Sequence, residues 1–446
     1  MSQRQGWAAS RRDFLKGAAA AGGAAAALAI ARAAHAAGDD TIKIALVGCG
    51  GRGTGACAQA LQTKGPIKLV AMADVFADRI DASLRNIQNE LQKRGLKDRV
   101  DVSDERKFTG FDGFKQAIEL VDLVLLTTPP HFRPVQYDAA VKAGRHVFME
   151  KPCCVDGPGY RQLLATNEEA KSKKLSVVVG FQRHHQQNYL EGIKKIRDGA
   201  VGDIQYIRTY FNMPAGGHND SPKPAGMTEM EYQLRRWGMF TWLSGDHIVE
   251  QACHEIDIAN WVMDAHPISA NGMGGRQVRT GRGNGEIWDH HFVEYEFAGG
   301  VRHYAQARQQ PGVWSHVSDN VHGSKGMMTI GSGPYGSGGP SDYSGGEDRA
   351  ASLSVNPYQQ EHDDLLASIR GTGAYHFEGD YGAASSMTAV LGRMATYSGQ
   401  VVTWEQAANS ELRLAPDRYA LDATPPIVPD EEGNYPVAMP GATVAF

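Results

Sequence analysis

Short apolar runs alternate with helical patterns along the first part of the chain. Stretches with helical spacing, such as residues 162–173, separate the runs. Five runs have the length of a buried strand: residues 42–47, 67–73, 121–128, 146–149 and 175–180. Strands that alternate with helices in this way predict a parallel, doubly wound sheet.

The pattern changes beyond about residue 185. Apolar and polar positions now alternate, which is typical of strands with one covered face. We expect four such strands, at residues 203–211, 287–297, 301–309 and 313–321. The chain is therefore predicted to be an α/β protein whose second domain holds a large, mostly antiparallel open sheet.

A helix of about residues 248–263 is predicted between the first of these strands and the rest. Its core stripe consists of Ile248, Ala252, Ile256, Ala259 and Met263. A second face carries Glu250, His254, Asp257 and Trp261. The acid and the imidazole on this face are spaced to lie one helical turn apart.

A glycine-rich turn follows the first strand. Gly48-Cys49-Gly50-Gly51-Arg52-Gly53 matches the G-x-G-x-x-G pattern that lets a backbone approach a pyrophosphate at a helix N-terminus. The second strand ends at Asp74, where an acid would bind ribose hydroxyls, and no arginine follows it directly. The turn therefore predicts a Rossmann domain that binds NAD rather than NADP, with a glycine-rich turn of an unrelated α/β domain as the alternative.

The N-terminus has the pattern of a twin-arginine (Tat) export signal. Ser10-Arg11-Arg12-Asp13-Phe14-Leu15-Lys16 precedes an Ala/Gly-rich run and the cleavage-type site Ala34-His35-Ala36. The run is too short for a membrane span, and no cysteine follows it to accept a lipid. We expect a mature protein from about Ala37, exported folded by the Tat machinery to the periplasm or the exterior, without a membrane anchor.

The composition limits the classes of binding partner that we expect. The net charge is −5 and no basic cluster with interleaved aromatic residues stands out, so nucleic acid is not expected as a partner. Five cysteines, two of them adjacent, imply no disulfide framework.

The predicted organisation is a signal peptide (1–36), the NAD-binding domain (37–184), a substrate and oligomerisation domain (185–423) and a Pro-rich C-terminal arm (424–446). The Gly/Ser/Pro-dense residues 331–347 are predicted to form a loop over the site.

Four motifs together resemble the Gfo/Idh/MocA oxidoreductases. They are the turn at 48–53, Pro129-Pro130-His131, Glu150-Lys151-Pro152 at a strand end, and an acid-x-x-x-His-x-x-Asp pattern at 250–257. The resemblance implies that Lys151 binds the reacting hydroxyl and His254 accepts its proton. It also implies an oligomer built on the open sheet. The cofactor-binding residues expected are Gly48, Gly50, Gly51, Arg52, Gly53, Asp74, Thr128, Pro129, His131, Glu150 and Lys151.

Imidazole suits the role of proton acceptor because its ordinary pKa lies near neutral pH. Glu250 is expected as a third catalytic residue that orients His254, although the sugar and inositol dehydrogenases of the family carry Asp at this position. The alternative for the pair is an exposed i,i+4 contact. A nicotinamidium nearby would lower the pKa of Lys151 and make it a proton relay.

Further residues are candidates for substrate binding. Arg183 and His184 follow the last Rossmann strand, and Trp237 and Trp242 could form an aromatic wall for a sugar ring; interdomain contacts and core packing are the alternatives. The pair His290-His291 could also supply donors for sugar hydroxyls. His247, Glu250 and His254 share a helical face but lack accepted zinc spacing, so no metal site is predicted.

Export constrains the chemistry, because free NAD is not expected outside the cytoplasm. We therefore expect an NAD-dependent oxidoreductase for secondary hydroxyls of a sugar or sugar derivative, with tightly bound NAD that is restored within each cycle. The second hypothesis is a glycosidase that works by transient oxidation, elimination, water addition and re-reduction. A third, of another class, is a non-catalytic NAD-binding partner module.

Overall fold

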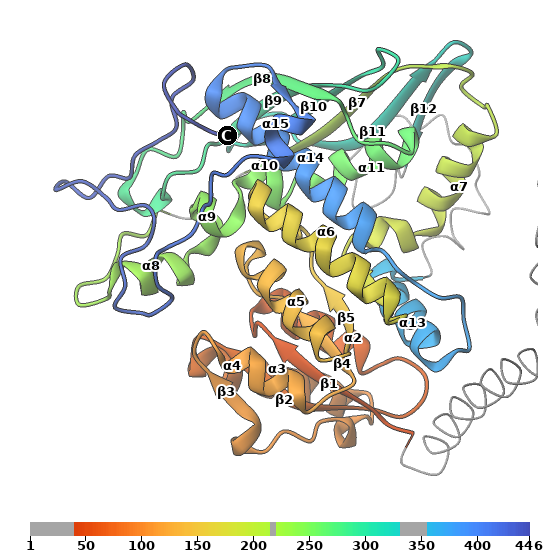
Figure 1. The fold of residues 1–446 in the computed structure, drawn as a ribbon, viewed down its shortest axis with the longest axis vertical. Coiled ribbons are helices and arrows are strands. Elements are labelled where there is room, and N and C mark those ends of the chain that lie inside the picture. Colours follow the sequence, from red (N-terminus) through yellow and green to blue (C-terminus); the bar gives the residue numbers. More distant parts are fainter. Residues whose placement is uncertain (1–39, 215–219, 331–354) are drawn as a thin grey trace, which may run out of the picture.

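The structure, a computed structural model, describes residues 40–214, 220–330 and 355–446. The predicted signal peptide and the predicted loop at 331–347 lie outside the described residues. Two sheets organise the chain, one in each domain (Figure 1). Within the described residues, no helix has the length and apolarity needed to cross a membrane.

The first sheet is parallel and follows the order β3-β2-β1-β4-β5-β6. Its strands are β1 (Ile42–Val47), β2 (Ile67–Asp74), β3 (Lys107–Thr109), β4 (Leu123–Leu126), β5 (His146–Met149) and β6 (Val177–Val179). The helices among them are α2 (Gly51–Ala60), α3 (Ala77–Lys93), α4 (Gly113–Glu119), α5 (Arg133–Lys142) and α6 (Gly157–Ser172). Alternate residues of β1 enter separate apolar clusters on the two faces, which confirms the predicted doubly wound sheet.

The second sheet follows the order β12-β11-β7-β10-β9-β8-β13. Its neighbouring described strands pair antiparallel except β7 and β10, which are parallel, so the mostly antiparallel sheet is confirmed. The strands are β7 (Ile204–Met213), β8 (Ser269–Gly275), β9 (His290–Glu296), β10 (Arg302–Gln309), β11 (His316–Gly323), β12 (Gly326–Ile330) and β13 (Val402–Thr403). The prediction missed β8, β12 and β13, which lack a clear alternation of apolar and polar residues.

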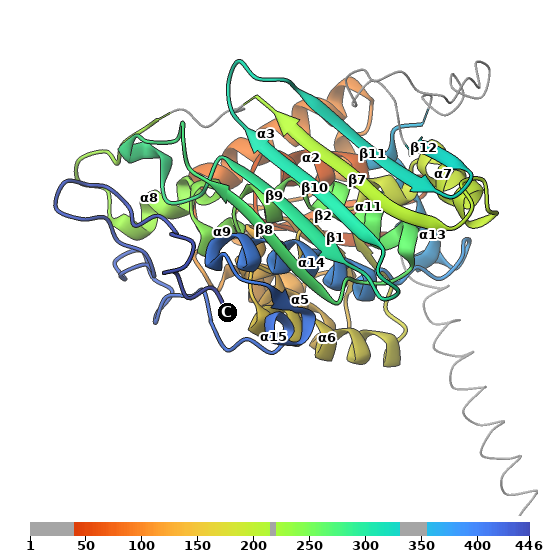
Figure 2. The same ribbon diagram turned by 90° about the horizontal axis from the view of Figure 1, so that it is seen from above.

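One face of this sheet is covered and the other is open (Figure 2). Helices α11 and α14 pack against the covered face. The described helices of this half, these two included, are α7 (Gln187–Arg197), α8 (Glu229–Arg235), α9 (Thr241–Ser244), α10 (His247–Glu250), α11 (Cys253–Met263), α13 (Pro357–Arg370), α14 (Gly379–Ser398) and α15 (Trp404–Ala408).

Helix α14 lies between the two sheets and is almost wholly buried. A Cβ added at Gly382 would lie 2.7 Å from Val179 of β6, and one added at Gly392 would lie 2.0 Å from the Tyr295 hydroxyl of β9. The two glycines therefore allow one helix to approach both sheets closely.

The predicted helix over residues 248–263 is wrong in one respect, because it is broken. Helix α10 ends at Glu250 and α11 begins at Cys253. The predicted core stripe is nevertheless largely buried, with Ile248, Ala252, Ile256 and Ala259 all in the core. The break matters for the site, since it frees the last carbonyl groups of α10 for other partners.

Two C-terminal segments return to earlier parts of the fold. Helix α13 falls within the predicted second domain, yet its Leu365 and Leu366 pack in the core of the first sheet. Residues 424–446 run in irregular conformation along the body of the same chain, where Tyr435 and Ala445 are buried.

Candidate active site

The glycine turn joins β1 to α2 at the carboxyl edge of the first sheet. Gly48 has a φ of +95°, and a Cβ there would lie 2.5 Å from the Thr128 nitrogen. A Cβ at Gly53 would lie 2.2 Å from the Gly48 carbonyl oxygen. Gly50 and Gly51 differ, since a Cβ on either would meet nothing within 4 Å. Two glycines thus serve the close packing of the turn, and two leave the start of α2 open for a pyrophosphate.

A cavity of about 220 Å³ lies in front of this turn. It is lined by most of the residues predicted to bind NAD: Gly48, Gly50, Gly51, Arg52, Gly53, Asp74, Thr128 and Pro129. Asp74 accepts hydrogen bonds from the backbone N–H groups of Cys49 (2.7 Å) and Phe76 (3.0 Å). Asp74 therefore fixes the turn and borders the cavity, a position that fits the ribose end of a dinucleotide.

The second domain supplies part of this cavity, which the sequence analysis did not anticipate. Leu234, Arg235 and Trp237 line it from the segment at the end of α8. The Arg235 guanidinium bonds both carboxylate oxygens of Asp78 at 3.2 Å and lies 3.9 Å from the centre of the Phe76 ring. Trp237, predicted to contact a sugar, thus borders the cofactor cavity. No local sequence pattern predicts the contact between Arg235 and Asp78, because the two residues are 157 positions apart.

Lys151 lies at the end of β5 and contacts the broken helix. Its Nζ donates to the Glu250 carbonyl and lies 3.4 Å from Glu250 Oε1. Burial opposes the charge of this ammonium, but Glu250, Cys253 and Glu150 outweigh it and raise the Lys151 pKa. A lysine held in its charged form suits binding of a substrate oxygen better than the predicted proton relay.

Glu150 performs a different task from its neighbour. Its carboxylate forms an ion pair with Arg52 of the glycine turn, and Arg52 also bonds Glu361 of α13 at 3.1 Å. The Arg52 guanidinium lies 4.8 Å from the centre of the Tyr358 ring. Glu150 and α13 therefore hold the turn in place from behind.

His254 has surroundings opposite to those of Lys151. Burial, with the positive charges of Lys151 and Arg183, lowers its pKa well below the ordinary value. The ring meets Phe181 edge-on at 5.9 Å, and its Nδ1 is buried with no hydrogen-bond partner among the described residues. A neutral imidazole with an unpaired ring nitrogen is able to accept a proton.

The expected contact in which Glu250 orients His254 is not present among the described residues. No hydrogen bond joins the two within the part of the chain that the structure describes, and Glu250 pairs with Lys151 instead. The helix break between α10 and α11 removes the i,i+4 geometry on which the prediction depended. The same break separates His247, Glu250 and His254. Within the described residues, their side chains do not come together as a group of metal ligands.

The other predicted site residues are engaged elsewhere. The His131 Nε2 lies 2.7 Å from the Tyr419 hydroxyl, and burial lowers its pKa to about 3. Arg183 pairs with Glu255 and, at 3.3 Å, with Asp319.

Two ring side chains are likewise packed into the interior. His184 contacts Asp257 at 2.8 Å and stacks between Trp261 and Tyr381. Trp242 is 1% exposed in an apolar cluster, which favours core packing over contact with a sugar.

The fold and the site together define a dinucleotide-dependent oxidoreductase. A family model described as "Oxidoreductase family, NAD-binding Rossmann fold" matches residues 42–181, and a "GFO/IDH/MocA C-terminal domain" model matches residues 189–329. Together they span more than half of the sequence. The chain belongs to the Gfo/Idh/MocA family and is an NAD-dependent oxidoreductase.

Individual relatives are distant. An inositol 2-dehydrogenase of Rhizobium meliloti is 22% identical over 65% of this chain and 75% of its own length. A 2,7-anhydro-N-acetylneuraminate hydratase of Escherichia coli is 26% identical over 41% of this chain and 44% of its own length. The structure of scyllo-inositol dehydrogenase from Lactobacillus casei, with bound NAD(H) and scyllo-inositol, is similar with a TM-score of 0.59 and 20% identity, covering 82% of this chain and 99% of that one.

Proposed function

We propose that the protein oxidises a secondary hydroxyl of a sugar or sugar derivative, and that its NAD stays bound and is restored within each cycle. The observation that carries the proposal is a charged lysine next to a neutral histidine, in a chain whose glycine turn borders a cofactor cavity that residues of the second domain help to close. The sugar and polyol names of the relatives agree with this substrate class.

The residues divide the work as follows. Charged Lys151 binds the oxygen of the reacting hydroxyl and stabilises negative charge that develops on it. Neutral His254 accepts the hydroxyl proton on its unpaired nitrogen. NAD, when bound in the cavity, supplies the hydride acceptor. Glu250 keeps Lys151 protonated and directed.

Retention of the cofactor is supported by the segment at the end of α8. Leu234, Arg235 and Trp237 border the cavity, and the Arg235 contacts to Asp78 and Phe76 bridge the two domains across it. A cofactor enclosed from both domains leaves slowly. This agrees with the predicted Tat export, since a folded protein carries its NAD outward and has no external supply.

A direct test is to purify the native protein, denature it and quantify the released dinucleotide. We expect nearly stoichiometric NAD after gel filtration, and a chain that neither retains nor rebinds NAD would overturn the proposal. Adding free sugars should then change the absorbance of the bound nicotinamide. If the absorbance of the bound nicotinamide stays unchanged with every sugar, and a protein partner is captured, the non-catalytic alternative is favoured.

The second candidate is a glycosidase that uses transient oxidation. It is favoured by the E. coli relative, which is named as a hydratase, an activity without net oxidation. Incubation with aryl glycosides separates the two: release of the aglycone without net reduction of NAD supports the glycosidase, and transfer of hydride between two free sugars supports the oxidoreductase.

Export and assembly complete the proposal. Replacing Arg11 and Arg12 by Lys should retain a reporter fusion in the cytoplasm, and unchanged export would contradict the Tat prediction.

The open face of the second sheet carries the aromatic side chains Tyr206, Tyr304, His322 and Phe292, which contact one another across four strands. Such a patch suits burial against a second copy of the chain. Light scattering in solution should give an oligomer, and a monomer at micromolar concentration would contradict it.

A further inference from the structure

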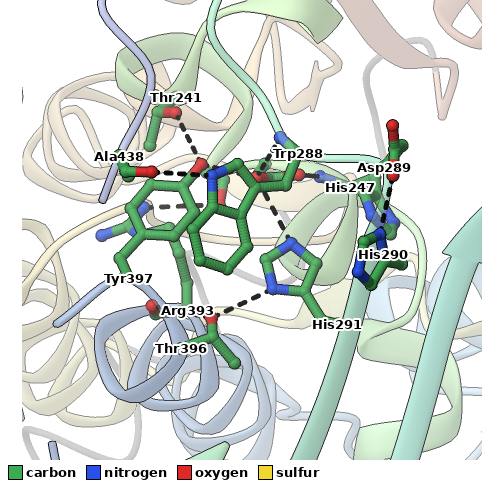
Figure 3. A network of polar contacts seen from close by, with 12 residues as sticks. Thr241, His247, Trp288, Asp289, His290, His291, Arg393, Thr396, Tyr397 and Ala438 are labelled. Carbon is green, nitrogen blue, oxygen red and sulfur yellow. Dashed lines mark hydrogen bonds and ion pairs between the residues drawn. The ribbon is translucent and has the colours of Figure 1, made fainter. Parts of the chain in front are cut away.

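One carboxylate and two imidazoles meet in the interior of the second domain. Asp246 and His247 lie where α10 begins. His291 lies on the covered face of β9, with its ring near that of His247 (Figure 3). Their exposed fractions are 0%, 3% and 3%. Each residue offers a ligand atom, and these atoms all lie within 4.8 Å of one another. The mechanism above uses none of the three.

The Asp246 carboxylate accepts hydrogen bonds inside the cluster. Its Oδ2 accepts the Trp288 backbone N–H at 3.0 Å and the Tyr397 hydroxyl at 2.5 Å. Asp246 also has a φ of +78°, a conformation that is unfavourable for a residue other than glycine.

The His291 ring faces this carboxylate with its Nε2, 3.4 Å from Asp246 Oδ2. On the other side, His291 Nδ1 lies 3.0 Å from Thr396 Oγ1 (Figure 3). The Thr396 hydroxyl has carbonyl acceptors for its one hydrogen in its own helix, and when it donates to them it accepts from Nδ1–H. In the neutral tautomer that results, the Nε2 lone pair points at a carboxylate. Two acceptors at this distance require a cation between them or a proton on Nε2.

His247 supplies the second, independent indication. Both of its ring nitrogens are buried and have no hydrogen-bond partner among the described residues. A neutral imidazole ring carries one unshared lone pair, and no described residue uses the lone pair of His247. Its centre lies 4.9 Å from that of His291. A buried neutral imidazole without partners is costly unless a ligand uses it.

We propose that Asp246, His247 and His291 bind a divalent transition-metal ion of the Zn²⁺ class. Tetrahedral nitrogen and oxygen ligands lie about 3.3 Å apart around such an ion. The Asp246–His291 pair already has nearly this spacing, and the His247 ring can turn because no hydrogen bond holds it. Two imidazoles and one carboxylate suit a borderline-soft cation, and Thr396 provides the outer contact that fixes a ligating histidine.

The ion would be structural, because the cluster is buried. It would tie the start of α10, three residues before Glu250, to β9 of the sheet. Through Tyr397, which bonds Asp246, the tie would extend to α14. The segment that carries the lysine partner Glu250 would then depend on the metal for its position.

The test measures metal, not turnover. The full chain is purified without chelators, and its metal content is determined by inductively coupled plasma mass spectrometry, with about one ion per chain expected. His247→Gln and His291→Gln should lower this content at least about tenfold. His290→Gln is the matched control, because His290 is adjacent to His291, 38% exposed and bonded to Asp289 instead. It should keep the metal.

Two further measurements do not depend on the variants folding. After dialysis against a chelator, adding Zn²⁺ to the wild-type chain should raise its melting temperature, and Co²⁺ should give the visible absorption bands of a tetrahedral site. Metal content that is absent from the wild type and not restored by Zn²⁺ or Co²⁺ would overturn the proposal and leave the cluster as a hydrogen-bonded network. Metal that persists in both glutamine variants would overturn it as well.

Discussion

The glycine turn at residues 48–53 and the segment at residues 246–254 both belong to the proposed site but contribute to it differently. The turn offers backbone, and its shape depends on residues that lack a side chain. The segment offers side chains, and its shape depends on partners far away in the sequence, such as Lys151 and His291. One region is specified locally and the other by the assembled fold, so substitutions should affect them in different ways.

The largest effect should come from the side-chain region. His254→Ala removes the proposed proton acceptor and should lower kcat by about 10²- to 10⁴-fold while NAD remains bound. Steady-state kinetics and dinucleotide quantification on the same preparation would check both. His266→Ala, at a histidine that stacks on Trp404, is the control and should keep activity. Retained turnover in His254→Ala would assign the proton transfer to another group.

The backbone region should respond to its glycines in two distinct ways. Gly53→Ala places a methyl group against the Gly48 carbonyl and Thr127, so it should lower the melting temperature and abolish NAD binding together. The methyl group of Gly50→Ala would contact no protein atom. This variant should keep the melting temperature of the free protein but bind NAD more weakly. Thermal denaturation with and without added NAD distinguishes the two. Equal destabilisation by both would contradict the division of roles.

A smaller effect is expected where the second domain covers the cavity. Arg235→Ala removes the contacts to Asp78 and Phe76, and dissociation of NAD should accelerate by up to about tenfold, since a partly exposed ion pair and a cation–π contact each contribute modestly. Release can be followed by fluorescence of the reduced cofactor. Arg94→Ala, which breaks an exposed pair with Glu90 on α3, should leave the rate unchanged.

The mildest test uses pH. The His254 pKa is lowered, so the ring is neutral at pH 7 and stays neutral as the pH falls through the ordinary histidine pKa of about 6.5. The acidic limb of kcat/KM should therefore lie below pH 6.5. A limb centred at or above that value would mean that His254 titrates as an ordinary, solvated histidine.

Sequence patterns were informative where a local constraint fixes the structure. The runs that became β1 and β5, and the turn between β1 and α2, are buried or tightly packed for reasons visible within ten residues. Strand β8 was missed because it is rich in glycine, and the structure shows why: a Cβ at Gly272 would lie 2.5 Å from the Phe292 carbonyl oxygen of β9. That requirement comes from the neighbouring strand.

The proposed catalytic pair shows the same limit. Lys151 and His254 were found through motifs, but the break after Glu250 has no local marker, because Gln251 and Ala252 are compatible with a helix. The contacts of Arg235 and of His291 likewise join segments that meet only after folding. Residue types identified the chemistry, and long-range packing determined which groups touch.

Helix α14 has a consequence for how the molecule loses its structure. It contacts β6 through Gly382 and β9 through Gly392, so neither sheet can shed this helix without exposing apolar surface of its own. The two domains should therefore melt in one cooperative transition rather than in two steps. A fragment that ends before residue 379 should be cleaved rapidly by proteases even though it contains the whole dinucleotide-binding sheet.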